Sequence, residues 1–436
     1  MPILSTFKKG GIHPRDMKSL SSGCKISVLP MPNELVIPMS MHLGAPASLL
    51  KNVGDRVFRG EKIGQASGFI SADVHSPADG VITAVKKVVL ANGVVCDAAV
   101  IQTDSEQSNP FSVLRDWNSM SKEQILSEIK DKGIVGTGGA TFPANVKLSI
   151  PEGKNVDALI INGVECEPYI TADHRIMIEK PSEVLEGIMI CAKVTSPRQI
   201  IIGIEENKPD AAEIIEKKIA ELNLHHIRVR LLKMKYPQGD EKQLVKAILD
   251  KEIPSGKLPL DVGAVVVNIG TAWSIFKAVA YGQPLIERVV TISGECIKNP
   301  CNVIAPMGTK VSDFIEYAGG FKEEPDKMIA GGPMMGFSFF NEETPITKGT
   351  NGLLFIKDKK NYEKTACLSC GKCVSACPIG LLPTKMFALI TNGKYEEAMK
   401  LNLMDCKECG CCAFSCPAHL DLVQAFKTGK KLGRKK

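Results

Sequence analysis

The chain has 436 residues, of which 44% are hydrophobic and 5% aromatic, and its formal net charge is +6. This length exceeds one ordinary core, so three or four domains are expected, and the few aromatic residues argue against a nucleic-acid-binding protein. The most apolar runs, such as Val262–Ile269, are shorter than the roughly 20 residues that cross a bilayer, and the N-terminus lacks a signal-peptide core. A soluble or peripherally attached cytoplasmic protein is therefore expected.

Residues 1–110 are predicted to form a compact all-β domain. Turn signals alternate with short β-rich runs at Val53–Gly64 and Ser76–Ile82. The two stretches resemble a lipoyl/biotinyl-type barrel-sandwich domain. No lysine lies between Lys62 and Lys86, so this domain is interpreted as a scaffold without a prosthetic arm.

Residues 111–285 are predicted to form a Rossmann-like α/β domain. A helix is expected to begin at Ser121, which forms a capping box with Gln124. Strands and helices then alternate, which favours a parallel sheet between two helical layers. Strands are expected at 158–161, 199–204, 227–232 and 263–269, and helices at 182–193, 210–222, 240–250 and 271–281.

The first candidate binding segment of this domain is a glycine-rich loop. It contains Gly136, Gly138 and Gly139, with Phe142 at its end and Lys147 beyond it. Glycines let backbone N–H groups approach a polyanion, and a lysine can neutralise a phosphate. The spacing departs from GxGxxG, so it does not indicate a standard dinucleotide fingerprint.

A second segment follows the first strand, where open parallel sheets bind ligands. It begins at Asn162 and carries Glu165 and Glu167. These carboxylates are interpreted as partners of ribityl or ribose hydroxyls, because hydride transfer requires positioning rather than a protein base. Acid–base chemistry and an ordinary solvated loop are the alternatives.

Two further segments join a strand end to a helix start. One contains Gly239, Asp240 and Glu241, and the other contains Asn268 and Thr271. The free N–H groups and the positive dipole of a helix N-terminus suit a phosphate. Together, the four segments predict a flavin site.

Residues 286–345 return to β character, and residues 346–436 form a Cys-rich, helical segment. Two cysteine runs in this segment have the spacing CxxCxxCxxxCP, which is that of bacterial two-cluster ferredoxins. In this motif the fourth cysteine of each run serves the other cluster. The first cluster is therefore assigned to Cys367, Cys370, Cys373 and Cys416, and the second to Cys406, Cys409, Cys412 and Cys377.

Structural zinc is the alternative for these cysteines, but zinc favours two pairs of ligands rather than runs of four with a trailing proline. Cys411 is interpreted as a packed thiol. The basic C-terminal end, which includes Lys430, Lys435 and Lys436, is interpreted as a solvated tail, with contact to anionic lipid or an acidic partner as the alternative.

The order of these motifs resembles the C-subunit family of Rnf complexes, the bacterial ion-translocating ferredoxin:NAD oxidoreductases. The shared sequences are GGATFP at 138–143, NGVECEP at 162–168, YPQG at 236–239, SGECIKNPCNV at 293–303, GGPMMG at 331–336, and both cysteine runs. The flavin segments also resemble the flavin-binding subunit of respiratory complex I, which has one cluster at this place rather than two. Relative to that subunit, Thr137 replaces a usual arginine.

The resemblance implies a β-grasp, SLBB-like unit at 286–345 and noncovalent FMN in the α/β domain. It implies that Phe142, Glu167 and Glu241 lie near NAD(H). The FMN contacts that it implies are Gly136, Gly138, Gly139, Lys147, Asn162, Glu165, Glu167, Gly239, Asp240, Glu241, Asn268 and Thr271.

The resemblance also implies a peripheral electron-input subunit at the cytoplasmic side of the bacterial membrane. Its partners would be the membrane and redox subunits of an Rnf-type complex and, indirectly, ferredoxin. Two alternatives stay open at this point: a soluble flavin reductase similar to the cobalamin reductase of microcompartments, and a pure electron-wiring module without flavin.

Overall fold

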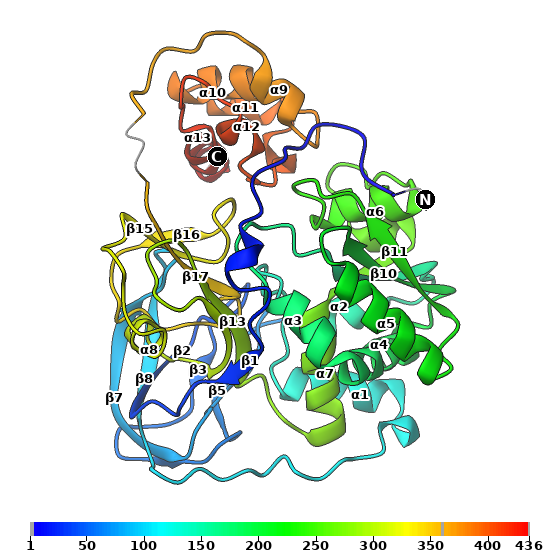
Figure 1. Cartoon of the computed structure of the whole chain (residues 1–436), viewed down its shortest axis with the longest axis vertical. Helices are drawn as coiled ribbons and strands as arrows, with labels where there is room; N and C mark the ends of the chain where they lie inside the picture. The colour runs from blue at the N-terminus through cyan, green and yellow to red at the C-terminus, as the bar shows by residue number, and fades with distance from the viewer. Residues whose placement is uncertain (1–3, 359–361, 435–436) are drawn as a thin grey trace.

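The computed structural model describes residues 4–358 and 362–434 and is mixed α/β, with four sheets and a helical C-terminal unit. Figure 1 shows the C-terminal helices at one end of the molecule and the N-terminal β domain at the other. The second β unit lies between them, and the α/β unit lies alongside, on the right of the view. The described residues contain no helix that is long and apolar enough to cross a membrane.

The N-terminal domain consists of two small sheets that share a hydrophobic core. Leu35, Ile37, Ile63, Ile82 and Ile101 are buried in this core, and β2 and β8 carry runs of consecutive buried residues. One sheet has the order β2 (Glu34–Pro38), β8 (Val95–Thr103), β7 (Gly80–Val89), β4 (Arg56–Val57); the other has the order β3 (Ser48–Leu49), β5 (Lys62–Gln65), β6 (Val74–His75).

The α/β unit is built on a four-stranded, fully parallel sheet. Its order is β11 (Ile227–Leu232), β10 (Gln199–Glu205), β9 (Ala158–Gly163), β12 (Ala264–Asn268). Ile160 and Val266 contribute to the core that contains α6 (Glu241–Leu249), whereas Leu159 and Ile161 contribute to the core that contains α4 (Pro181–Thr195) and α7 (Ile269–Tyr281). Both faces are thus buried, which explains the continuous apolar strands.

The remaining helices of this unit flank the same sheet or precede it. They are α1 (Lys122–Asp131), α2 (Ala144–Leu148), α3 (Ala172–Glu179) and α5 (Pro209–Glu221). The capping box that was predicted at Ser121 and Gln124 is present at the start of α1. The three-layer arrangement that the sequence predicted is confirmed.

The second β unit is a six-stranded mixed sheet with the short helix α8 (Val311–Tyr317). Its strands come from beyond the predicted range 286–345 on both sides, because β1 and β17 complete its hydrogen bonding. The order is β1 (Ile26–Val28), β14 (Cys301–Pro306), β13 (Glu287–Ser293), β17 (Gly352–Ile356), β15 (Lys327–Ala330), β16 (Phe337–Phe339).

The C-terminal unit is made of short helices around two cavities. They are α9 (Lys372–Ala376), α10 (Pro383–Thr391), α11 (Tyr395–Met399), α12 (Cys411–Phe414) and α13 (Leu422–Gly433). Lys430 on α13 donates to the carbonyl of Cys406 and to Glu408, both at 2.6 Å, so the solvated tail predicted here is wrong for this lysine. It is part of a packed amphipathic helix whose buried face includes Phe426. Lys435 and Lys436 lie outside the described residues.

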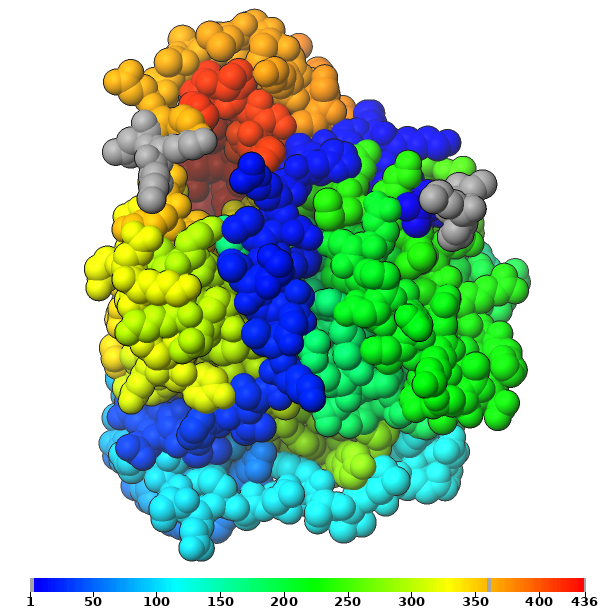
Figure 2. Space-filling model, viewed as in Figure 1, coloured from blue at the N-terminus to red at the C-terminus, as the bar shows by residue number. Residues whose placement is uncertain are grey.

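Residues 4–25, here called the N-terminal strap, join these units. Figure 2 shows the strap (blue) along the seam between the α/β unit and the second β unit. Gly11 N–H donates to the carbonyl of Ala376 at 2.9 Å, and Ile12 and Tyr236 exchange two backbone hydrogen bonds of 2.9 Å. The strap thus contacts the C-terminal unit and the loop after β11 at once.

Candidate functional site

The four candidate flavin segments meet at the carboxyl edge of the parallel sheet. Asn162 lies near the end of β9 and its Nδ2 donates to the carbonyl of Gly239 at 2.9 Å, which joins the second and third segments. Thr137 Oγ1 donates to Asn268 Oδ1 at 2.9 Å, and Thr137 N–H donates to Thr271 Oγ1 at 2.9 Å, which joins the first and fourth. The tertiary structure therefore forms one site from four separate stretches.

The glycine-rich loop is anchored at one residue and open at the next. Thr137 is buried and its carbonyl accepts a hydrogen bond of 3.1 Å from Arg288, whereas Gly138 and Gly139 are exposed. Gly139 has φ +110°, a conformation that favours glycine. Gly136 N–H donates to the carbonyl of Phe142 at 2.9 Å and closes the loop, which leaves the backbone between them accessible to a polyanion.

Three predicted ligands of this site already have protein partners. Lys147 pairs with Glu241 and donates to the carbonyl of Val266 at 3.2 Å. Asp240 caps α6 by accepting the N–H groups of Lys242 (3.0 Å) and Gln243 (3.3 Å). The Lys147–Glu241 pair is partly exposed and can open to a ligand, whereas Asp240 is held in a structural role.

The two carboxylates of the second segment are buried rather than solvated. Glu165 Oε1 accepts the N–H of Asp173 at 2.7 Å, and Oε2 lies 3.6 Å from Lys18 Nζ. Burial raises the pKa of Glu165 to about 7, and the nearby Lys18 charge opposes this shift. The side chain of Glu165 is 3% exposed, so its carboxylate stabilises the loop through buried contacts with Asp173 and Lys18.

Glu167 is held by the second β unit. Its two carboxylate oxygens accept the backbone N–H groups of Met334 at 3.0 Å and Met335 at 2.9 Å, within the GGPMMG sequence. A Cβ at Gly332 would lie 2.2 Å from Glu167 Oε2, so only glycine leaves room there. Burial raises the pKa of Glu167 to about 7, although the two N–H groups oppose this shift.

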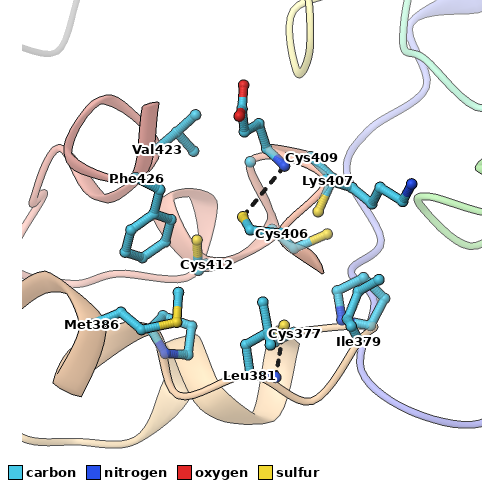
Figure 3. A pocket seen from close by; sticks show the side chains of 15 residues that line it. Cys377, Ile379, Leu381, Met386, Cys406, Lys407, Cys409, Cys412, Val423 and Phe426 are labelled. Atoms are coloured by element: carbon cyan, nitrogen blue, oxygen red, sulfur yellow. Dashed lines mark hydrogen bonds between the residues drawn. The ribbon is translucent and has the colours of Figure 1, made fainter. Parts of the chain in front are cut away.

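The first cavity of the C-terminal unit is lined by the four cysteines that were predicted for the second cluster, and also by Cys411. Figure 3 shows Cys377 facing Cys406, Cys409 and Cys412 across the cavity. The cavity encloses about 370 Å³, open solvent included. Leu381 N–H donates to Cys377 Sγ at 3.3 Å, and such N–H···S bonds stabilise thiolate charge.

The second cavity, of about 410 Å³ with open solvent included, is lined by the other four predicted cysteines, including exposed Cys367 and Cys370. In the described residues no three His, Cys, Asp or Glu side chains converge as they would on a single metal ion. A four-iron cluster is wider than an ion and takes one thiolate at each iron, so thiols spread around a cavity fit it. The ligation of the clusters stays a prediction.

The first cavity adjoins one of the candidate flavin segments. Tyr236, the first residue of the YPQG sequence that ends at Gly239, donates its hydroxyl hydrogen to the carbonyl of Cys409 at 2.8 Å. Tyr236 also packs with Cys409 and Cys411 in a small apolar core. Cys411 is fully buried, as expected for a packed thiol.

Sequence reasoning missed the buried cations around this site. Lys18 comes from the strap, Arg288 from β13, and Lys208, whose Nζ donates to the carbonyl of Val164 at 2.7 Å, from the start of α5. Each is more than 40 residues from the loop that it holds. Nothing in local pattern distinguishes them from surface cations, which is why no sequence signal identified them.

Family models match each part of the chain. The RnfC barrel sandwich hybrid domain matches residues 5–106, and the Nuo51 FMN-binding domain matches residues 129–277. The SLBB domain matches residues 289–338, and the 4Fe-4S dicluster domain matches residues 366–420.

Curated relatives align over almost the whole chain. The C subunit of the proton-translocating ferredoxin:NAD(+) oxidoreductase complex of Clostridium ljungdahlii is 41% identical, covering 92% of this chain and 88% of the relative. The C subunit of the ion-translocating oxidoreductase complex of Rhodobacter capsulatus is 42% identical, covering 98% and 83%. The C subunit of the Na(+)-translocating ferredoxin:NAD(+) oxidoreductase complex of Acetobacterium woodii is 40% identical, covering 98% and 96%.

A solved NAD+-reducing NiFe hydrogenase in its H2-reduced state has a similar fold. It aligns with a TM-score of 0.51 and 15% sequence identity, covering 75% of this chain and 65% of that chain. At this identity the likeness concerns the fold alone.

Proposed function

This chain belongs to the family of C subunits of ion-translocating ferredoxin:NAD(+) oxidoreductase complexes, and on that premise we propose that it is the peripheral electron-input subunit of such a complex. Its cofactors are FMN and two 4Fe-4S clusters, and its substrate is NAD(H). When bound, FMN exchanges a hydride with the nicotinamide and the clusters carry electrons singly, which converts a two-electron carrier into one-electron traffic.

The contact between Tyr236 and Cys409 is the single observation that carries this proposal. It joins a flavin segment directly to a loop that lines the inner cysteine-lined cavity. The cavity lined by Cys377 is accordingly the inner cluster site, and the cavity lined by exposed Cys367 is the outer one, next to a redox partner. The proposed location is the cytoplasmic side of the membrane, bound to the other subunits of the complex.

The chain's own groups position the cofactor in this proposal. The exposed backbone N–H groups at Gly138 and Gly139 would hold the FMN phosphate, and Lys147, once released from Glu241, would neutralise it. By the family resemblance, Phe142 and Glu167 would lie near NAD(H), and Glu167, fixed by two N–H groups, would orient the nicotinamide. A soluble cobalamin-type reductase is not favoured, because the curated relatives are named as subunits of ion-translocating complexes.

Anaerobic reconstitution tests the proposal. About eight irons and one FMN per chain are expected, together with bleaching of the flavin when NADH is added. Zinc in place of iron, or a chain that binds both clusters but no flavin, would contradict it. Co-purification with the membrane subunits is the expected result when the whole complex is extracted.

A further inference from the structure

Lys18 is a buried lysine that reaches the flavin site from outside the α/β unit. It begins the short turn η1 (Lys18–Leu20) in the strap and is 5% exposed. Its Nζ donates to the carbonyl of Glu167 at 3.0 Å and to the carbonyl of Ile170, and it lies 3.6 Å from Glu165 Oε2. A buried ammonium requires such partners, and here all three belong to one loop.

The loop that Lys18 contacts needs external support. Residues Glu165 (φ +46°) and Tyr169 (φ +68°) both have left-handed backbone, which costs free energy in a residue with a side chain. Lys208 holds the start of the loop through the carbonyl of Val164. The strap holds the rest of it, through Lys18 and through Asp16, whose carbonyl accepts Tyr169 N–H at 2.7 Å.

We propose that Lys18 is a positioning residue of the flavin site, which fixes the Glu165–Ile170 loop in the form that binds FMN and makes the N-terminal strap part of that site. The inference rests on the proposed function, because this loop is one of the four segments assigned to FMN.

The charge on Lys18 gives this role a signature in pH. The charged groups that face Glu165 are Lys18 from the strap, Asp173 from α3 and Lys208 from the start of α5. Within the described part of the chain, Glu165 Oε2 accepts no hydrogen bond. The positive charge of Lys18 is therefore what compensates a negative charge on this oxygen. Without Lys18, the already raised pKa of Glu165 moves further upward, and ionisation of the buried carboxyl then opposes the ordered loop as pH rises through that pKa.

The test compares FMN dissociation constants and hydrogen exchange of the FMN-free loop at about pH 6 and about pH 9. The variants are Lys18→Met, Lys18→Met with Glu165→Gln, and Lys25→Met as an exposed strap control. All are full-length and cluster-loaded. We expect Lys18→Met to bind FMN at least about tenfold more weakly at the higher pH, with a smaller loss at the lower pH and faster exchange in residues 165–170.

The added Glu165→Gln should remove the pH dependence of this loss, whereas Lys25→Met should match the wild type. Lys18→Arg keeps the cation and should keep the wild-type pH dependence even if its affinity falls, which covers the case in which Lys18→Met does not fold. The inference is overturned if Lys18→Met binds FMN as tightly as Lys25→Met at both pH values. It is also overturned if FMN binding by Lys18→Arg depends on pH as it does in Lys18→Met. A wild-type chain that binds no FMN would instead contradict the proposed function.

Discussion

At the scale of single residues, the site depends on polar groups that are buried against one another. Glu165 and Glu167 are held by backbone N–H groups and by a lysine from the strap, rather than exposed as a loop would leave them. Such groups are costly to bury alone, so each partner matters more than its individual hydrogen bond suggests. Substitutions that remove one partner are therefore informative.

The inner cavity gives a matched pair of cysteines for a cluster test. Cys412→Ala should reduce the iron content from about eight to about four per chain, because one cubane loses a thiolate at a corner. Cys411→Ala, at the neighbouring buried thiol, should retain about eight, because Cys411 Sγ points toward the carbonyl of Tyr236 (3.9 Å). Iron and sulfide analysis of anaerobically purified protein measures both, and equal iron in the two variants would contradict the ligand assignment.

Glu167 predicts a specific dependence of stability on pH. Its pKa rises from 4.5 in the unfolded chain to about 7 in the folded one, so the folded state binds more protons between these values. The free energy of unfolding should therefore fall as pH rises through this window, by an amount on the order of 3 kcal/mol from this group.

Glu167→Gln removes this titration and should flatten the decline. Denaturant unfolding at a series of pH values measures the slope, which is independent of the cost of the substitution itself. Identical slopes in variant and wild type would show that Glu167 does not titrate in this range.

At the scale of elements, the strap contacts both a proposed flavin loop and the chain beside the inner cavity. It has little regular structure of its own, but it pairs with Tyr236 and contacts Ala376 beside the cavity. Gly10, with φ +60°, lies so close to Cys377 that a Cβ would come within 2.4 Å of its carbonyl carbon. The close contact between the strap and Cys377 therefore requires a glycine at position 10.

Gly10→Ala should displace the C-terminal unit from the flavin loops, at a cost of about 1–3 kcal/mol. We expect normal flavin reduction by NADH but slowed reduction of the clusters, measured by stopped-flow absorbance. Gly23→Ala is the control, because a Cβ at that strap position meets none of the described residues within 4 Å. Cluster reduction as fast as in the control would mean that the strap does not set this alignment.

At the scale of the whole molecule, the units are packed against one another through a shared hydrophobic core and buried side chains. One continuous hydrophobic core contains Leu35 and Ile101 of the N-terminal domain together with Ile161 and Ile188 of the α/β unit. Lys348, fully buried in the loop before β17 of the second β unit, donates to the carbonyls of Asp73 and Gly133 at 2.7 Å each. The second of the proposed flavin loops is likewise held from outside the α/β unit, by Met334 and Met335 of the second β unit and by Lys18 of the strap.

This arrangement predicts an order of electron flow. Cys370→Ser should remove the outer cluster and leave the inner one reducible by NADH, whereas Cys409→Ser should remove the inner cluster and leave the outer one nearly unreduced. The reason is that electron-transfer rates fall steeply with distance and, of the two cavities, the inner one adjoins the flavin loops. Electron paramagnetic resonance after a brief NADH pulse distinguishes the two, and rapid reduction of the outer cluster in Cys409→Ser would reverse the order.

Regular elements and cluster motifs were accessible from the sequence because their signals are local. The strands β9, β10, β11 and β12 and the helices α4, α5, α6 and α7 lie where apolar runs and capping residues predicted them, whereas α3, directly after β9, was not predicted. The duplicated cysteine spacing predicted even the exchange of Cys377 and Cys416 between the two sets that line the cavities.

The contacts that complete the site were decided only by the tertiary structure. Lys18, Arg288 and Lys208 look like ordinary cations in the sequence, and their roles arise when burial brings distant carbonyls and carboxylates to them. The β-strand pairing of residues 26–28 with β14, and the folding of Lys430 against Cys406, have the same origin. Local sequence encodes backbone preference and thiol spacing, whereas the compensation of a buried charge depends on which segments meet, and that is a property of the whole fold.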